Sequence, residues 1–77
     1  MIQLAEVKEG TRVKITKIES GKTLISRLCA LGIREGGKSK VIRNDSSGGP
    51  MIIQVFESKL AIGRGQAKKI MVEILNE

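Results

Sequence analysis

The chain has 77 residues and a net charge of +6, from 14 Lys and Arg against 8 Asp and Glu, which is enough length for one small core. It contains no histidine and one cysteine, so the usual ligand sets for zinc, copper and iron–sulfur centres are missing and no internal disulfide can form. The excess of positive charge is compatible with binding to nucleic acid, an anionic membrane or an acidic protein. Binding of single-stranded nucleic acid is disfavoured, because one phenylalanine cannot form a platform on which bases stack.

The first half of the chain predicts one strand and one helix. Residues 11–18 follow a turn at Gly10 and alternate polar and apolar side chains through Ile15, which is the period of a half-buried strand. Apolar side chains then recur at helical spacing: Leu24, Ile25, Leu28 and Leu31. We expect an amphipathic helix over residues 22–31 with Ser20 or Thr23 as its N-cap and Gly32 as a left-handed C-terminal cap.

The second half predicts strands separated by turns. The β-prone runs are residues 38–43, 51–56, 59–62 and 70–74. Residues 44–50 are dense in turn formers, and residues 63–69 form a glycine-bearing bend that holds one helical turn. We therefore expect one mainly β domain over residues 1–77, a small SH3-like or OB-like barrel of about five strands with the helix between the first and second strands.

The sequence shows neither a membrane-spanning run nor a signal peptide, so we expect a soluble, intracellular protein. Gly21-Lys22-Thr23 is similar to the end of a phosphate-binding loop, but the first glycine of that motif falls on Thr16, inside a predicted strand. Gly63-Arg64-Gly65 is similar to the start of a dinucleotide fingerprint, but Lys68 stands where its third glycine belongs. We therefore expect no bound nucleotide and no other cofactor.

Cys29 lies at the edge of the apolar helix stripe and has no histidine to activate it, so we expect a buried or half-buried small hydrophobe. No other catalytic constellation is visible, and the chain is not expected to be an enzyme. Basic residues form two groups that are either solvated faces or docking surfaces for an acidic partner. These residues are Arg64, Lys68 and Lys69, and Lys38, Lys40 and Arg43.

The segment from Arg27 to Gly36 resembles the FeoA signature, Arg-Leu-x-x-Leu-Gly-Ile-x-x-Gly. Its structural positions, together with an earlier glycine, are Gly10, Leu28, Leu31, Gly32 and Gly36. The resemblance continues through Gly49-Pro50, Leu60-Ala61-Ile62, Ala67 and Ile70-Met71-Val72 and covers nearly the whole chain. The chain departs from the family in the bend at residues 63–66, where the family more often shows Arg and Glu.

The resemblance implies a small cytoplasmic protein with an SH3-like barrel that serves bacterial ferrous iron uptake. Its implied partner is FeoB, a membrane transporter with a cytoplasmic GTPase domain, on which the helix and adjoining loops would dock. The basic residues assigned to that contact are Lys22, Arg27, Arg34, Arg64 and Lys68. With no histidine and one cysteine, the chain is a poor iron chelator. We therefore expect the protein to act by binding its partner, and we expect no insertion into the membrane.

Several alternatives stay open at this stage. Arg27 has either an interface role or a structural role in capping a carbonyl or covering the barrel with its stem. The whole chain would alternatively be a basic nucleic-acid-binding barrel or a metal-responsive regulatory domain. Exposed apolar side chains would support weak self-association, and the candidates are Met51, Ile52 and Phe56.

Overall fold

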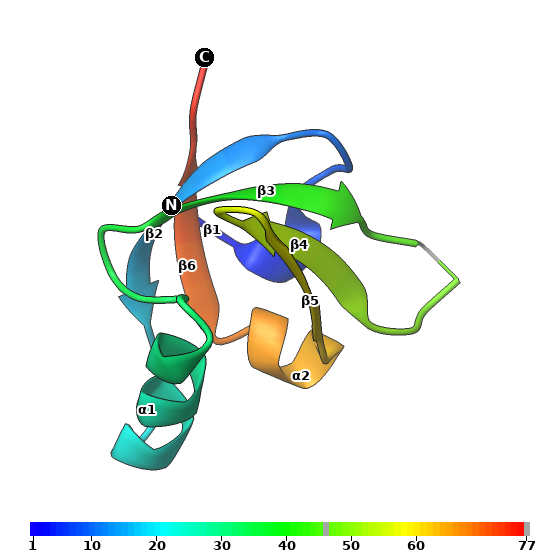
Figure 1. Cartoon of the computed structure of the whole chain (residues 1–77). Helices are drawn as coiled ribbons and strands as arrows, with labels where there is room; N and C mark the ends of the chain where they lie inside the picture. The colour runs from blue at the N-terminus through cyan, green and yellow to red at the C-terminus, as the bar shows by residue number, and fades with distance from the viewer. Residues whose placement is uncertain (46, 77) are drawn as a thin grey trace.

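One curled antiparallel sheet makes up most of the molecule. Within residues 1–45 and 47–76, which the computed structural model describes, six strands pair in the order β1-β6-β2-β3-β4-β5 (Figure 1). The strands are β1 (Ile2–Gln3), β2 (Arg12–Ile18), β3 (Lys38–Arg43), β4 (Met51–Val55), β5 (Ser58–Ile62) and β6 (Ile70–Ile74). The first and last parts of the chain therefore pair with each other, and β3, β4 and β5 follow as consecutive neighbours.

Three short helical segments join the strands. They are a 3-10 helix η1 (Leu4–Glu6) and the α-helices α1 (Lys22–Ala30) and α2 (Arg64–Ala67). The segment η1 follows β1, α1 connects β2 to β3, and α2 connects β5 to β6. Figure 1 shows that α1 projects away from the sheet, whereas α2 lies beneath it.

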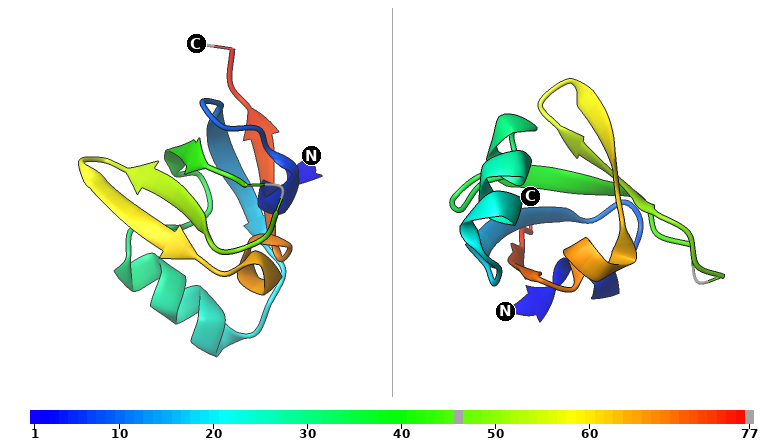
Figure 2. Two further views of the ribbon diagram at one scale, coloured as in Figure 1. Left: turned by 90° about the vertical axis from the view of Figure 1, so that its right-hand side faces the viewer. Right: turned by 90° about the horizontal axis from the view of Figure 1, so that it is seen from below.

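The sheet is open between its edge strands β1 and β5. The pairing order ends at these two strands, so the sheet curls without closing into a fully hydrogen-bonded barrel. The helix α2, which follows β5, lies against η1, which follows β1 (Figure 2). The two short helical segments therefore pack together between the edges of the curled sheet, and α2 contributes the buried Ala67 there.

Alternation along the strands builds the core. Val13, Ile15 and Ile18 of β2 are buried, and so are alternate residues of β4 and β6. The β2–β6 pairing shifts register between Ile15 and Lys17, and this irregularity lets Ile18, rather than Lys17, face the core. Each inward methyl or methylene group contributes roughly 0.8 kcal/mol of hydrophobic stabilisation, so this register is strongly specified.

Several predictions from the sequence are confirmed. The strands expected at 38–43 and 70–74 coincide with β3 and β6, and the helical turn expected within 63–69 is α2. Gly32 has φ +94°, as expected for a left-handed cap.

None of the helices within residues 1–45 and 47–76 combines the length and the apolar character needed to span a bilayer.

Other predictions are wrong. The expected five strands omitted β1, which is only two residues long and pairs with the distant β6, so α1 lies between the second and third strands. Gly21, rather than Ser20 or Thr23, occupies the N-cap of α1, and no side-chain cap hydrogen bond forms there. Met51 was expected to be exposed but is fully buried, because it begins the inward-facing row of β4.

Candidate functional site

The helix α1 buries little of its surface. Leu28 is its one buried residue, and Leu24 packs half-buried against the core. Ile25 is 37% exposed, and Leu31, directly after the helix, is 50% exposed. The sequence predicted one apolar face, but the sheet covers only its centre, so two large apolar side chains face solvent on a projecting element.

The signature residues fasten the C-terminal end of α1. Gly32 donates its N–H to the Cys29 carbonyl at 2.9 Å, and Ile33 donates to the Leu28 carbonyl at 2.8 Å. This hydrogen-bond pair, with a left-handed glycine, is the Schellman motif. Ile33 and Leu28 are both buried, which supplies the hydrophobic contact that accompanies the motif. The Leu-x-x-Leu-Gly-Ile segment therefore sets where α1 ends and how it meets the sheet.

Gly32 also permits a close approach to the β4–β5 hairpin. A Cβ at this position would lie 3.1 Å from Cγ1 of Val55. Val55 is itself only 4% exposed and closes the end of the core. A glycine is thus needed at residue 32 for its backbone conformation and for space, and the end of α1 is held against the hairpin.

The turn after α1 is tied to β2. Gly37 donates to the Arg34 carbonyl at 3.0 Å, which closes a β-turn with Gly36 at φ +86° in its third position. Gly36 donates to the Ile15 carbonyl at 2.7 Å, and the Ile15 N–H donates to the Gly37 carbonyl at 2.8 Å. These bonds present the exposed side chains of Arg34 and Glu35 from a braced turn.

Three of the five basic residues assigned to partner contact lie on one continuous segment. Lys22 begins α1, Arg27 lies in its last turn and Arg34 lies in the braced turn, and all three are exposed. Within the part of the chain that the structure describes, the Arg27 guanidinium makes no hydrogen bond or ion pair, so it caps no carbonyl there. Together with the exposed apolar residues they define the α1 surface. Its members are Lys22, Ile25, Arg27, Leu31 and Arg34.

Arg64 has structural contacts of its own. It is half-buried at the start of α2, and its Nη2 donates to Asn44 Oδ1 at 2.8 Å and to the Asp45 carbonyl. Asn44 in turn donates from Nδ2 to the carbonyls of Ala5 at 3.0 Å and Val7 at 2.7 Å. Arg64 therefore clamps the end of β3 to α2 and η1, away from the α1 surface. Lys68 follows α2 and is exposed there.

The prediction for Cys29 is wrong. Its thiol is exposed, because it lies on the flank of α1 that the sheet does not cover. The case against a phosphate-binding loop is strengthened, because Thr16 lies within β2 and its hydroxyl donates to the Met71 carbonyl at 3.1 Å. Among the described residues, no three Cys, Asp or Glu side chains are grouped so that they could hold a metal ion.

A second surface feature lies on the outer face of the sheet. A hollow of about 530 Å³ is lined by side chains of β2, β3, β4 and the hairpin tip. The residues that shape it are Arg12, Lys38, Lys40, Gln54, Phe56 and Leu75. The sequence had identified Lys38 and Lys40 as one basic group, but it could not place Arg12 beside them because the pairing of β2 with β3 spans a whole helix. Alternation of polar residues in β2 was the signal that Arg12 shares their outward face.

Comparison with known proteins gives a consistent assignment. The FeoA domain model matches residues 2–74. A curated relative, "Putative Fe(2+) transport protein A" of Methanocaldococcus jannaschii, is 51% identical over 73 residues, which cover 95% of this chain and 87% of the relative. The chain thus shares sequence with this family over nearly its whole length.

Solved structures agree in fold. The crystal structure of an iron uptake regulatory protein (FeoA) is 31% identical and superposes with a TM-score of 0.84 over 96% of each chain. The solution structure of the FeoA protein from Chlorobium tepidum is 32% identical, with a TM-score of 0.87 over 96% of this chain and 70% of the other. From the family model, the 51% identity and the shared curled sheet, we conclude that the chain belongs to the FeoA family.

Proposed function

We propose that this protein is a cytoplasmic accessory protein of ferrous iron uptake, which docks on a FeoB-type membrane transporter and modulates its GTPase domain. Family membership supports the role in iron uptake, since the curated relative is described as a putative Fe(2+) transport protein and the crystal structure as an iron uptake regulatory protein. The proposed contact is the α1 surface. The action is exerted through the partner, so the chain needs neither a nucleotide nor a metal site of its own.

The observation that carries the proposal is the incomplete burial of α1. A helix of an isolated domain normally covers its apolar stripe with the core, yet here Ile25 and Leu31 stay 37% and 50% exposed. At the same time the helix end is fixed by the Schellman motif and the close approach of Gly32 to Val55. A helix with a fixed C-terminal end and uncovered apolar residues matches the way amphipathic helices enter grooves on partners.

Charge adds orientation to this contact. Arg27 and Leu31 lie four residues apart and therefore share one flank of α1, while Ile25 and Cys29 share another. The buried Leu28 lies between the two flanks, so a partner groove with an apolar floor and an acidic rim would fit the flank of Arg27 and Leu31. Arginine is enriched in interface hot spots because its planar head pairs with carboxylates bidentately.

The test is co-purification of the protein with the cytoplasmic domain of the FeoB-type transporter from the same genome, with GTP hydrolysis measured in the complex. We expect the wild type to be retained, and Leu31→Asp and Arg27→Glu each to reduce retention at least about tenfold, since a buried anchor or a charge pair is lost at the interface. Neither change should unfold the protein, because both side chains are exposed.

Lys8→Glu is the matched control. Lys8 is exposed and precedes β2, whereas α1 follows the other end of that strand, so the charge reversal is equal but remote. The proposal requires Lys8→Glu to be retained like the wild type. Loss of retention in the control to the same degree, or absence of any complex with the wild type, would contradict docking through α1.

A further inference from the structure

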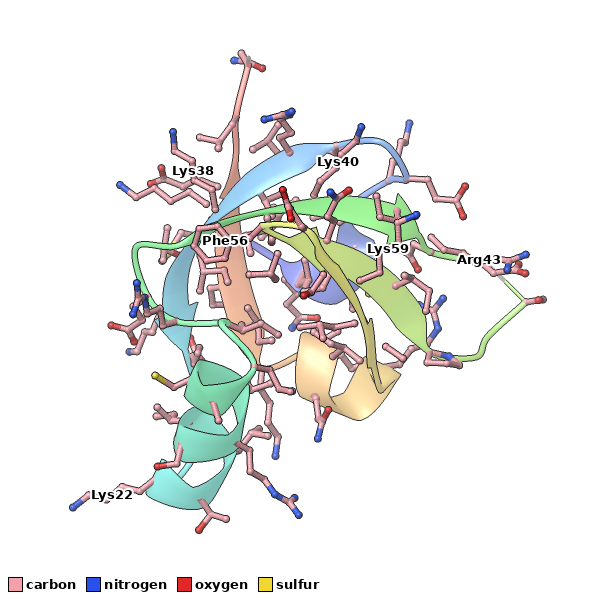
Figure 3. The ribbon with its side chains drawn as sticks, in the orientation of Figure 1. Lys22, Lys38, Lys40, Arg43, Phe56 and Lys59 are labelled. Carbon is pink, nitrogen blue, oxygen red and sulfur yellow. The ribbon has the colours of Figure 1, made fainter. Side chains whose placement is uncertain are left out.

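The hollow on the outer face of the sheet differs from the α1 surface in position and in chemistry. We call it the basic hollow, and its side chains come from β2 (Arg12), β3 (Lys38, Lys40), β4 (Gln54), the hairpin tip (Phe56) and the residue after β6 (Leu75). The described residues that line it include three cations and no carboxylate. Figure 3 shows Lys38 and Lys40 in the upper part of the molecule with Phe56 below them, far from Lys22 at the free end of α1.

The cations of the basic hollow are placed opposite one another across the sheet. Arg12 lies opposite Lys40 in the β2–β3 register. Two residues further along β2, Lys14 lies between Lys38 of β3 and Glu73 of β6, so a carboxylate stands beside that pair. Directly opposite residues on one face have Cβ atoms roughly 4.5–5.5 Å apart, and like charges at this distance destabilise a sheet. The Arg12–Lys40 pair is therefore an unfavourable contact that an anionic ligand would relieve. Lys59, opposite Gln54 on β5, extends the same positive face.

Phe56 is a second energetically unfavourable feature of the basic hollow. It is the first residue of the two-residue turn between β4 and β5, where φ is +54° although glycine or asparagine normally occupies such a position. Its ring is 84% exposed. The Gln54 side chain braces this turn by donating from Nε2 to the Phe56 carbonyl at 3.1 Å. An aromatic residue held in a strained backbone and left in solvent indicates a contact made with something else.

We propose that the basic hollow binds an acidic, extended peptide segment of a partner protein, with one apolar side chain of that segment seated between Phe56 and Leu75. Carboxylates of the segment would lie over Arg12 and Lys40 and relieve their mutual repulsion. This inference is independent of docking through α1, because it concerns a different face and different residues. The basic hollow would be a second binding surface besides the α1 surface. The protein could then bind two components of an assembly at the same time.

Shape and composition favour a peptide over other anions. An anionic membrane presents a plane, which does not enter a hollow of about 530 Å³. A nucleic-acid backbone offers phosphates but no apolar group to place against Leu75, and the one aromatic ring of the chain cannot form a stacking platform. Acidic residues around an aliphatic side chain match both the cations and the apolar walls.

The experiment uses a short fluorescein-labelled peptide of glutamates around one central leucine, and fluorescence anisotropy at low salt. We expect it to bind at least about tenfold more tightly than the same peptide with glutamine in place of glutamate, and to weaken steeply with added salt. Arg12→Gln and Lys40→Gln should each weaken binding several-fold. Lys69→Gln is the matched control, because Lys69 is exposed at the opposite end of β6 from Leu75.

The apolar part of the proposal has its own test. Phe56→Asn suits the left-handed turn and should raise the melting temperature, so weaker binding by this variant cannot come from misfolding. Compared with the wild type, Phe56→Asn should bind the peptide with the central leucine several-fold more weakly. It should bind a peptide with glycine in place of that leucine as well as the wild type does. Equal losses for both peptides would refute the apolar seat.

Two further results would overturn the proposal as a whole. One is equal binding of the glutamate and glutamine peptides. The other is tighter binding of duplex DNA, or of phosphatidylserine-containing vesicles, than of the glutamate peptide, with the same dependence on Arg12 and Lys40. Because Lys8 and the α1 surface play no part in these assays, their outcome is separate from that of transporter co-purification.

Discussion

The close contact between α1 and the β4–β5 hairpin can be tested with Gly32→Ala. The new Cβ would lie 3.1 Å from Val55 Cγ1, and the residue would have to keep φ +94° for the Schellman motif to survive. Gly10→Ala is a natural control, because Gly10 has φ +86° but no atom within 4 Å of the added Cβ. The two substitutions therefore share the backbone cost and differ in the steric cost.

The expected losses in the free energy of unfolding follow from the backbone cost and the steric cost. A left-handed non-glycine residue costs about 1–2 kcal/mol, and the smaller entropy of the unfolded alanine chain returns about 0.4–1 kcal/mol, so Gly10→Ala should destabilise by about 1 kcal/mol. At residue 32 the contact falls on a side chain that is only 4% exposed and cannot swing into solvent. Overpacking of this kind costs about 1–3 kcal/mol, so Gly32→Ala should lose about 2–4 kcal/mol in total.

The free energy of unfolding is best measured by urea titration followed by circular dichroism, since the chain has no tryptophan or tyrosine. Val55→Ala removes the methyl group in question, so the double variant with Gly32→Ala should lose about 1–3 kcal/mol less than the sum of the single variants. If Gly32→Ala costs no more than Gly10→Ala, or the double variant shows no coupling, the close approach does not hold α1 in place.

Three further measurements follow from the structure. Asn44→Ala removes the side-chain donor to two backbone carbonyls and one of the two acceptors of the Arg64 guanidinium, and should lower the free energy of unfolding by about 1–3 kcal/mol in urea titration. Leu28→Ala, which empties a buried site, should cost about 2–5 kcal/mol, whereas Leu31→Ala at a half-exposed site should cost within about 0.5 kcal/mol. Hydrogen bonds from the Ser47 N–H and hydroxyl lower the pKa of Asp45 below its ordinary 3.8, so its contribution to stability is present above that pH and is lost as pH falls through the lower folded pKa. The difference in urea midpoint between wild type and Asp45→Asn should accordingly shrink on acidification, and a difference that is constant with pH would refute this.

Much of the sheet could be predicted because most of its strands are β-prone runs separated by turn-forming residues. β3 lies between Gly36-Gly37 and Asn44-Asp45, and in β6 the β-branched residues Ile70, Val72 and Ile74 recur at a period of two. β1 could not be found in this way, since Ile2–Gln3 is too short to show a period and is a strand only because β6 pairs with it. Strand pairing over such a separation is a tertiary effect with no local signal.

The site was harder to predict than the sheet. Helical spacing identified the apolar residues of α1 correctly, but it could not show that the sheet would cover only Leu28 and part of Leu24. Cys29 and Leu31 were assigned to a covered face for that reason. Likewise, the charge of Arg64 was visible, while its hydrogen bonds to a loop twenty residues away were not.

The two ends of α1 should differ in local stability. The C-terminal turn of α1 is held by the Schellman bonds and the buried Leu28, whereas Gly21 gives its N-terminal turn no side-chain cap. The amide hydrogens of residues 25 and 26, the first with intrahelical acceptors, should therefore exchange through local fraying, and those of residues 28–33 only through opening of the core. A partner bound to α1 would suppress the fraying. Protection of these amide hydrogens from exchange would therefore report partner binding.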